Sequence, residues 1–69
     1  MDIYAQPGTK VIFLNQNGTD YDLQNAREHF KEGDVLTVAK TEVGSWSTSV
    51  YFKEVPGVGF NSVMFQEAV

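Results

Sequence analysis

The sequence contains no cysteine, which excludes disulfide bonds, thiol chemistry and cysteine-ligated zinc sites. It has a single histidine, His29, so a metal site would also need carboxylates such as Glu28 or Glu32. Glu28 points elsewhere on a helix, and His29 with Glu32 gives two ligands of mixed hardness, which do not make a site. We therefore expect His29 to lie at a solvated helix end, with no metal and no cofactor.

Basic residues are few, since five Lys and Arg stand against nine Asp and Glu, for a net charge of −4. They are spread singly from Lys10 to Lys53 and form no basic run of the kind that follows a phosphate backbone or binds an anionic membrane. We expect no direct binding of nucleic acid and a partner with a basic surface.

Long hydrophobic runs are also missing. No stretch approaches the ~20 apolar residues of a membrane span, and the first eight residues lack the basic and apolar regions of a signal peptide. The cytoplasm is therefore the expected location. The serines lie in predicted turns or strands, without a Gly-x-Ser-x-Gly elbow and with only one possible base, so we expect no enzymatic activity.

The 69 residues leave room for one domain, residues 1–69, with a core near the lower size limit for independent folding. A second subunit would add stability to so small a core, so a homo-oligomer is compatible with this length. Pro7-Gly8 suits a type II turn. Residues 1–8 then form either an edge strand folded back on the next segment or a frayed extension.

Periodicity predicts one amphipathic helix across residues 20–31. Leu23, Ala26 and Phe30 recur on one helical face, Thr19 or Asp20 can cap the N-terminus, and Gly33 stops the helix. A short apolar segment at residues 11–14, ending in turn formers, predicts a central strand before this helix.

Two further strands form a predicted hairpin. Residues 35–41 carry alternating β-branched side chains, residues 43–45 turn the chain, and residues 47–55 return. Residues 56–59 (Pro-Gly-Val-Gly) form another tight turn, and residues 60–65 pack back through a 3₁₀ turn. These elements predict a mainly β fold with one α-helix between the first two core strands, in which a small antiparallel sheet closes into a barrel.

Side-chain alternation predicts which face of the returning strand is buried. Trp46, Thr48, Val50 and Phe52 share one face and are expected to point to the core, whereas Tyr51 is on the outward face. The predicted core consists of Phe13, Leu23, Phe30, Leu36, Val38, Val50, Phe52 and Phe65. Nine aromatic residues exceed what so small a core needs, so some are available for a partner.

The candidate binding residues are Trp46, beside a turn, Tyr51, on the outward face of its strand, and Asn61, a polar neighbour from the closing segment. Trp and Tyr dominate interface energetics at low entropic cost. Packing in the core is the competing interpretation for Trp46, and the two interpretations are balanced for Tyr51. Together the three residues would form an aromatic patch with an acidic rim.

The segment at residues 59–67 resembles the end of SH3 domains, where a 3₁₀ turn precedes the last strand, and Gly44-Ser45-Trp46 adds to the likeness. No Ala-Leu-Tyr-Asp-Tyr stretch is present, so the proline-peptide groove of SH3 domains does not carry over. A closer resemblance spans residues 10–67. It consists of Phe-Lys-Glu-Gly at 30–33, Leu-Thr-Val at 36–38, Val-Gly-Ser-Trp-x-Thr-Ser-Val-Tyr at 43–51 and Phe-Asn-Ser-Val-x-Phe at 60–65.

In that order the pieces resemble small SH3-like proteins encoded by phages and prophages of Gram-positive bacteria. The resemblance implies an SH3-like domain and a phage origin, and by analogy a protein that binds and blocks a host factor, including one of an immune system. One alternative is an oligomeric sponge for a nucleotide-like signal, in which aromatic rings stack on bases. Lys40, Lys53, Arg27 or the helix start near Thr19 would then contact phosphate. A minor structural or regulatory phage protein is a further alternative.

Overall fold

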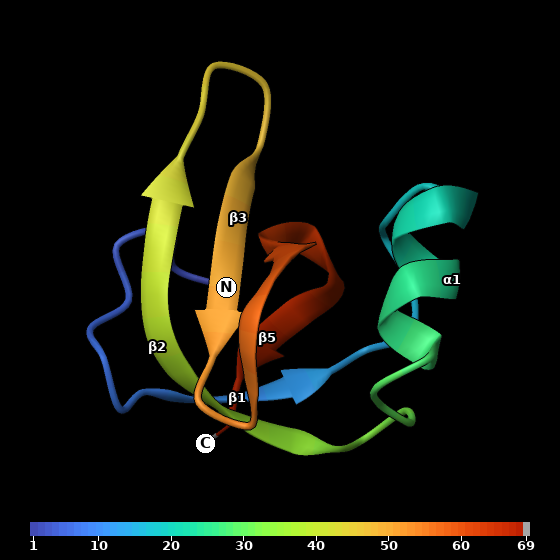
Figure 1. Ribbon diagram of the computed structural model, residues 1–69, viewed down its shortest axis with the longest axis horizontal. Coiled ribbons are helices and arrows are strands. Elements are labelled where there is room, and N and C mark those ends of the chain that lie inside the picture. The colour runs from blue at the N-terminus through green and yellow to red at the C-terminus, as the bar shows by residue number, and fades with distance from the viewer. Residues whose placement is uncertain (69) are drawn as a thin grey trace.

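The computed structural model describes residues 1–68, which form five strands, one α-helix and one 3₁₀ turn (Figure 1). In chain order the elements are β1 (Lys10–Phe13), α1 (Asp20–Arg27), β2 (Val35–Val43), β3 (Thr48–Phe52), β4 (Val55–Asn61), η1 (Ser62–Met64) and β5 (Phe65–Glu67). The predicted mainly β fold with one helix is confirmed, as are the 3₁₀ turn and the hairpin. None of the described helices is long and apolar enough to cross a membrane.

The strands form one antiparallel sheet in the order β4-β3-β2-β1-β5. The long strand β2 belongs to both halves of this sheet. Its first residues pair with β1, as in Leu36 opposite Val11, and its later residues pair with β3, as in Thr41 opposite Val50. The register shifts between Val38 and Lys40, where the strand bends (Figure 1). The bend folds the two halves toward each other over a shared core.

The sheet is open, whereas the sequence predicted a closed barrel. In the described part of the chain, β4 and β5 are the two edges and share no hydrogen-bonded ladder. The outer side of β5 is already used, because the Met1 amino group donates to the Phe65 carbonyl at 3.0 Å and the Asp2 amide donates to the Glu67 carboxylate at 2.8 Å. These contacts place the N-terminal residues along the outer side of β5.

Residues 1–8 contain no strand but are held against the sheet. Pro7 and Gly8 occupy the centre of the expected turn, since the Thr9 amide donates to the Gln6 carbonyl at 3.1 Å and Gly8 has φ +95°. The Gly8 amide also donates to the Val38 carbonyl of β2 at 2.7 Å. This bond fixes the turn beside the bend in β2.

The helix ends earlier than predicted, at Arg27 instead of residue 31. Its start agrees with the sequence, because the Thr19 hydroxyl and the Asp22 carboxylate form a capping box. At the other end the amides of His29 and Phe30 both donate to the Ala26 carbonyl, which tightens the last turn. The chain leaves the helix there because Phe30 must reach the core, where it is 5% exposed.

The turn between β3 and β4 also differs from the prediction. Pro56 and Gly57 lie within β4, and the turn is formed by Lys53 and Glu54. Thr37 holds this turn, since its carbonyl accepts from the Lys53 amide at 2.9 Å and its amide donates to the Glu54 carboxylate at 2.9 Å. Proline is tolerated in β4 because an edge strand does not need every amide.

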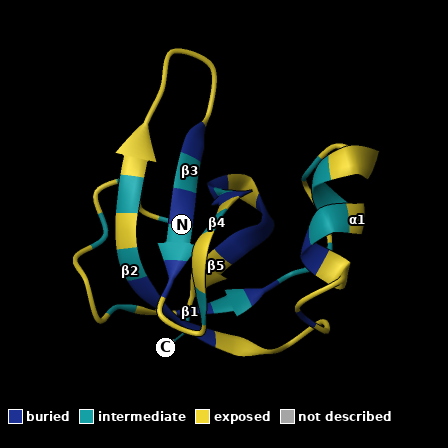
Figure 2. Ribbon diagram, viewed as in Figure 1, coloured by how far each residue is buried: buried dark blue, intermediate teal, exposed yellow. Residues whose placement is uncertain are grey.

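The core lies between the two halves of the sheet and is closed on one side by α1 (Figure 2). Seven of the eight predicted core residues are buried, and Leu23 packs only against the margin. The prediction omitted four buried hydrophobic residues: Val11, Ala26, Phe60 and Met64. Phe60 shows that this core accepts all five phenylalanines of the chain, one more than expected.

Candidate functional site

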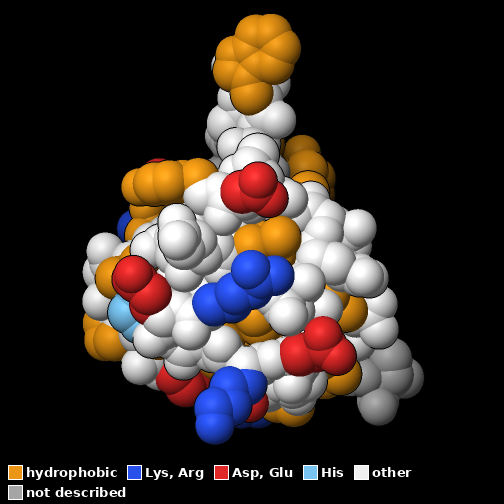
Figure 3. Space-filling model, turned by 90° about the vertical axis from the view of Figure 1, so that its right-hand side faces the viewer, with side chains coloured by type: hydrophobic (Ala, Val, Ile, Leu, Met, Phe, Trp, Pro, Cys, Tyr) orange, Lys and Arg blue, Asp and Glu red, His pale blue; other side chains and the backbone are white. Residues whose placement is uncertain are grey.

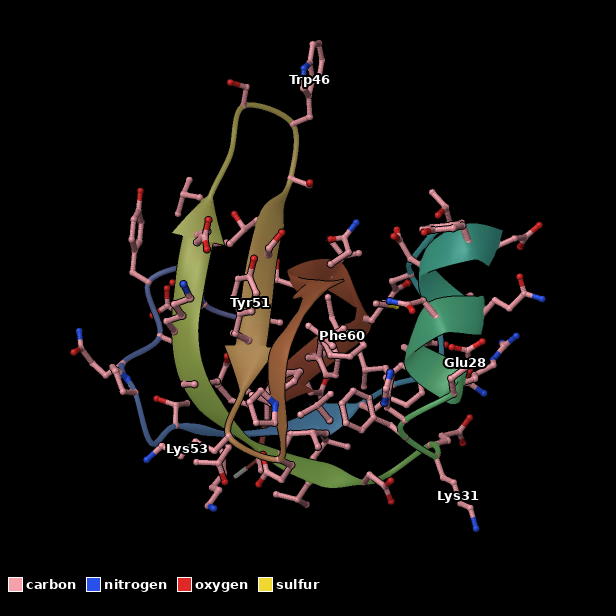
Figure 4. The ribbon with its side chains drawn as sticks, in the orientation of Figure 1. Glu28, Lys31, Trp46, Tyr51, Lys53 and Phe60 are labelled. Carbon is pink, nitrogen blue, oxygen red and sulfur yellow. The ribbon has the colours of Figure 1, made fainter. Side chains whose placement is uncertain are left out.

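Trp46 lies at the tip of the β2–β3 hairpin, and its side chain projects away from the body (Figure 4). It is 98% exposed, so the expected packing of Trp46 against the core is wrong. β3 begins only at Thr48, so the alternation that buries Thr48, Val50 and Phe52 does not extend to the tip. The Gly44 amide closes the tip by donating to the Ser47 carbonyl at 2.9 Å. We call residues 44–47 the hairpin tip.

Tyr51 lies on the outward face of β3 and is partly buried. It stands opposite Lys40 of β2 and Gly59 of β4. The Lys40 ammonium lies over the ring, 4.7 Å from its centroid, in a cation–π contact. The ring also lies against Gly59, where an added Cβ would be 3.0 Å from Tyr51 Cζ. These two neighbours fix the phenol ring on the sheet.

A hollow of about 350 Å³ opens beside this ring, next to the bend in β2 and the turn after β3. Its lining residues are Ala39, Lys40, Tyr51, Phe52, Lys53, Pro56 and Gly57. The charged residues of this lining are both lysines. Lys40 also pairs with Glu42 at 3.2 Å on the exposed surface of β2. We call this feature the Tyr51 hollow.

Asn61 is held by contacts within the protein. Its side-chain amide donates to the Asp22 carboxylate at 3.1 Å, and its side-chain oxygen accepts from the Val63 amide at 3.3 Å. It therefore joins β4 to the start of α1 and caps η1. Its register position, opposite Ser49, places it on the same face as Tyr51.

The structure therefore places two of the three candidate residues, Tyr51 and Asn61, on the same face of the sheet and Trp46 on the hairpin tip. Sequence reasoning missed Gly59, the surface on which the Tyr51 ring lies. A glycine inside a strand is a signal for such a close approach.

The comparisons with known proteins give a family. A family model matches residues 2–69. The chain belongs to the family described as bacteriophage T4 protein Y07B. The phage origin implied by the resemblance is confirmed, because the matched region covers nearly the whole chain of this phage protein. No curated protein and no solved structure matches the chain.

The Glu54 carboxylate, next in sequence to Lys53 of the Tyr51 hollow, stabilises the turn that carries Lys53. Burial tends to raise the pKa of Glu54, but hydrogen bonds from the Thr37 amide and hydroxyl, a bond to its own backbone and the positive charge of Lys10 together hold it below the ordinary 4.5. Glu54 is therefore ionised at neutral pH and keeps the turn in place through its bond to β2.

The side of the phage protein that carries α1 has a surface of mixed charge. Figure 3, which looks onto the side of α1, shows acidic and basic side chains interspersed, with no patch of one sign. Arg27 donates from Nε to the Asn15 side chain, and the His29 ring packs edge-on against Phe60 at 5.7 Å. These contacts engage the two residues of the helix end that were considered for phosphate and for metal.

Proposed function

We propose that this phage protein is a non-enzymatic accessory protein that binds and blocks a host protein in the host cytoplasm, with Trp46 as its main anchor. The observation that carries the proposal is the 98% exposure of the only tryptophan, at the tip of a projecting hairpin. A tryptophan contributes to folding through burial, and here it is left out of the core. Its surface becomes useful when a partner covers it.

The position of Trp46 suits an anchor. The hairpin tip is narrow and stands clear of the body (Figure 4), so the indole can enter a pocket on another protein. Tryptophan is among the residues that most often dominate binding energy when a partner's pocket surrounds them. The neighbouring Val43 is 52% exposed and adds apolar surface beside the tip. The partner therefore needs an apolar pocket that accepts one indole ring.

Charge defines the surroundings of that pocket. The net charge of −4 attracts the protein toward a basic surface and speeds its encounter with it. A basic surface is where many host proteins bind nucleic acid, and a protein docked there would occlude it. The 3₁₀ turn before β5 supports the SH3-like part of the resemblance, and binding modules are a common use of small sheets of this kind.

Intrinsic fluorescence and capture together test the proposal. The only tryptophan reports its own burial, so emission should shift to the blue when purified partner is added. Tagged protein should capture a host protein from a lysate, and Trp46→Ala should abolish the capture. Tyr21→Ala is the matched control, because Tyr21 is 79% exposed on α1, away from the hairpin tip. It should capture the same host protein as the unmodified chain.

Two results would contradict the proposal. Equal capture by the Trp46→Ala protein and the unmodified protein would remove Trp46 as the anchor. Stable recovery of the protein with purified phage particles, together with no host protein in the capture, would favour a structural role in the phage.

A further inference from the structure

The Tyr51 hollow is separate from the hairpin tip and has its own chemistry. It combines one aromatic ring, two lysine side chains and a floor that includes Ala39, Phe52 and Pro56. The floor is largely apolar, whereas both charged groups of the lining are positive. On a chain with net charge −4, two of the five basic residues meet at this one hollow. A lining with two lysines and an apolar floor favours an anion that also has an apolar part.

The ring is presented in a way that favours a flat ligand. Tyr51 lies against Gly59, and the Lys40 ammonium lies over the ring, 4.7 Å from its centroid. The same ammonium forms a salt bridge with the Glu42 carboxylate at 3.2 Å. Both side chains are exposed, so this salt bridge is weak. A planar ring can take its place over Tyr51, and the displaced ammonium can then meet an anionic group of the ligand.

We propose that the Tyr51 hollow binds a small ligand that combines a planar ring with an anionic group, the chemistry of a nucleoside monophosphate. The planar ring stacks on Tyr51, which offers a face to any base. Lys40 and Lys53 contact the anion from the two sides of the ring. Lys53 is exposed and its backbone is fixed by the bond to the Thr37 carbonyl, so its charge stays near the hollow.

The volume of the Tyr51 hollow and its place in the fold limit the size of the ligand. A volume of about 350 Å³ is near the lower end of the range for small-molecule sites, about 300 to 1,000 Å³. One ring and one anionic group fit such a hollow, whereas a dinucleotide needs a second subunit to cover it. The start of α1 and Arg27 do not line the hollow, so two phosphate contacts considered in the sequence have no part in it.

An NMR titration with adenosine 5′-monophosphate tests the site on the full chain. Amide shifts should concentrate at residues 39–41 and 51–53 and at Gly57. Adenosine and inorganic phosphate, added separately, should each bind at least about tenfold more weakly, because each supplies only one of the two contacts. Equal binding of phosphate alone would overturn the proposal, and so would shifts confined to another part of the protein.

Matched variants separate the two contacts. Lys53→Met keeps an apolar stem and removes the charge, and should weaken binding about tenfold. Lys31→Met removes a lysine that lies beside the helix, outside the hollow (Figure 4), and should leave binding unchanged. Tyr51→Leu should weaken binding roughly tenfold by removing the stacking surface. Equal effects of Lys53→Met and Lys31→Met would show that only net charge matters and would overturn the proposal.

Ligand binding at the Tyr51 hollow can be tested separately from the proposed function of Trp46. Trp46→Ala should bind adenosine 5′-monophosphate as the unmodified protein does, because Trp46 does not line the hollow. A short single-stranded oligonucleotide is the remaining comparison. Tighter binding of that oligonucleotide than of the mononucleotide would overturn the assignment to a free small ligand.

Discussion

The aromatic residues fall into two groups that lie in different parts of the structure. All five phenylalanines are at most 5% exposed and meet in tilted or edge-to-face pairs with ring centroids 4.8 to 6.4 Å apart. Trp46, Tyr21 and Tyr4 are 98%, 79% and 70% exposed, and Tyr51 is partly buried. The rings without a polar atom hold the fold together, whereas the rings with one remain at the surface.

This division separates stability from binding. A phenylalanine removed from the core leaves a cavity that its neighbours cannot fill. A surface tryptophan or tyrosine can be removed with little effect on folding. The following predictions test how cleanly this division holds, from the largest expected effect on stability to the smallest.

Phe52→Ala should lower the free energy of unfolding by about 3 to 5 kcal/mol, because Phe52 is 1% exposed and contacts three other phenylalanine rings. That is most of the stability of a domain this small. Thermal denaturation followed by circular dichroism measures the effect. Phe52→Leu should lose less and remain folded. A melting temperature near that of the unmodified protein in both variants would contradict the inward placement of this residue.

Asn61→Ala should cost about 1 to 2 kcal/mol, because it removes the bond to Asp22 and the cap of η1. Asn61 tests the division between stability and binding. It lies on the same face of the sheet as Tyr51, but its side chain is engaged in hydrogen bonds within the protein. Urea denaturation measures the change, with Gln24→Ala on the exposed side of α1 as control. Equal stability of the two variants would return Asn61 to the binding surface.

Glu54→Gln should lower the melting temperature slightly at pH 7 and not at low pH. The folded-state pKa of Glu54 is below its ordinary value, so its charge stabilises the fold above about 4.5, and that contribution is lost as pH falls through the folded pKa. Melting temperatures of both proteins from pH 7 to pH 3 measure this. Glu32→Gln controls for net charge. A difference that persists unchanged at pH 3 would mean that the charge is not the cause.

Trp46→Ala should change the free energy of unfolding by no more than about 0.5 kcal/mol, as expected for a surface substitution. Its side chain is almost fully exposed, so folding gains little from it. Thermal denaturation followed by circular dichroism measures this. A substantial loss of stability would show that the hairpin tip packs on the body, and would weaken its role as an anchor.

The sequence predicted the elements well where alternation or helical spacing ran over several residues. Alternation along β3 predicted that Val50 and Phe52 point inward, and the helical pattern predicted a cap at Thr19 or Asp20, of which the structure uses Thr19. The end of α1 was misplaced, since burial of Phe30 in a distant core overrides local helix propensity.

The candidate site was predictable only in part. Tyr51 was assigned to the outer face by alternation alone. The exposure of Trp46 depends on where β3 begins, and the Tyr51 hollow depends on the bend at Ala39 and on the early turn at Lys53 and Glu54. The bond between Glu54 and Thr37 joins residues far apart in the sequence, so no local pattern announces the turn.

The pairing of β1 with β5 has a consequence for how the chain reaches this fold. Phe13 stands opposite Phe65, so the sheet is completed only when segments about fifty residues apart meet. Closing so long a loop is slow, because its entropy must be lost before the contacts form. Before β5 pairs with β1, the four phenylalanines that contact Phe65 in the folded protein expose apolar surface to solvent. The pairing of β5 with β1 is therefore expected to be the late step of folding, and aggregation should compete with it at high protein concentration.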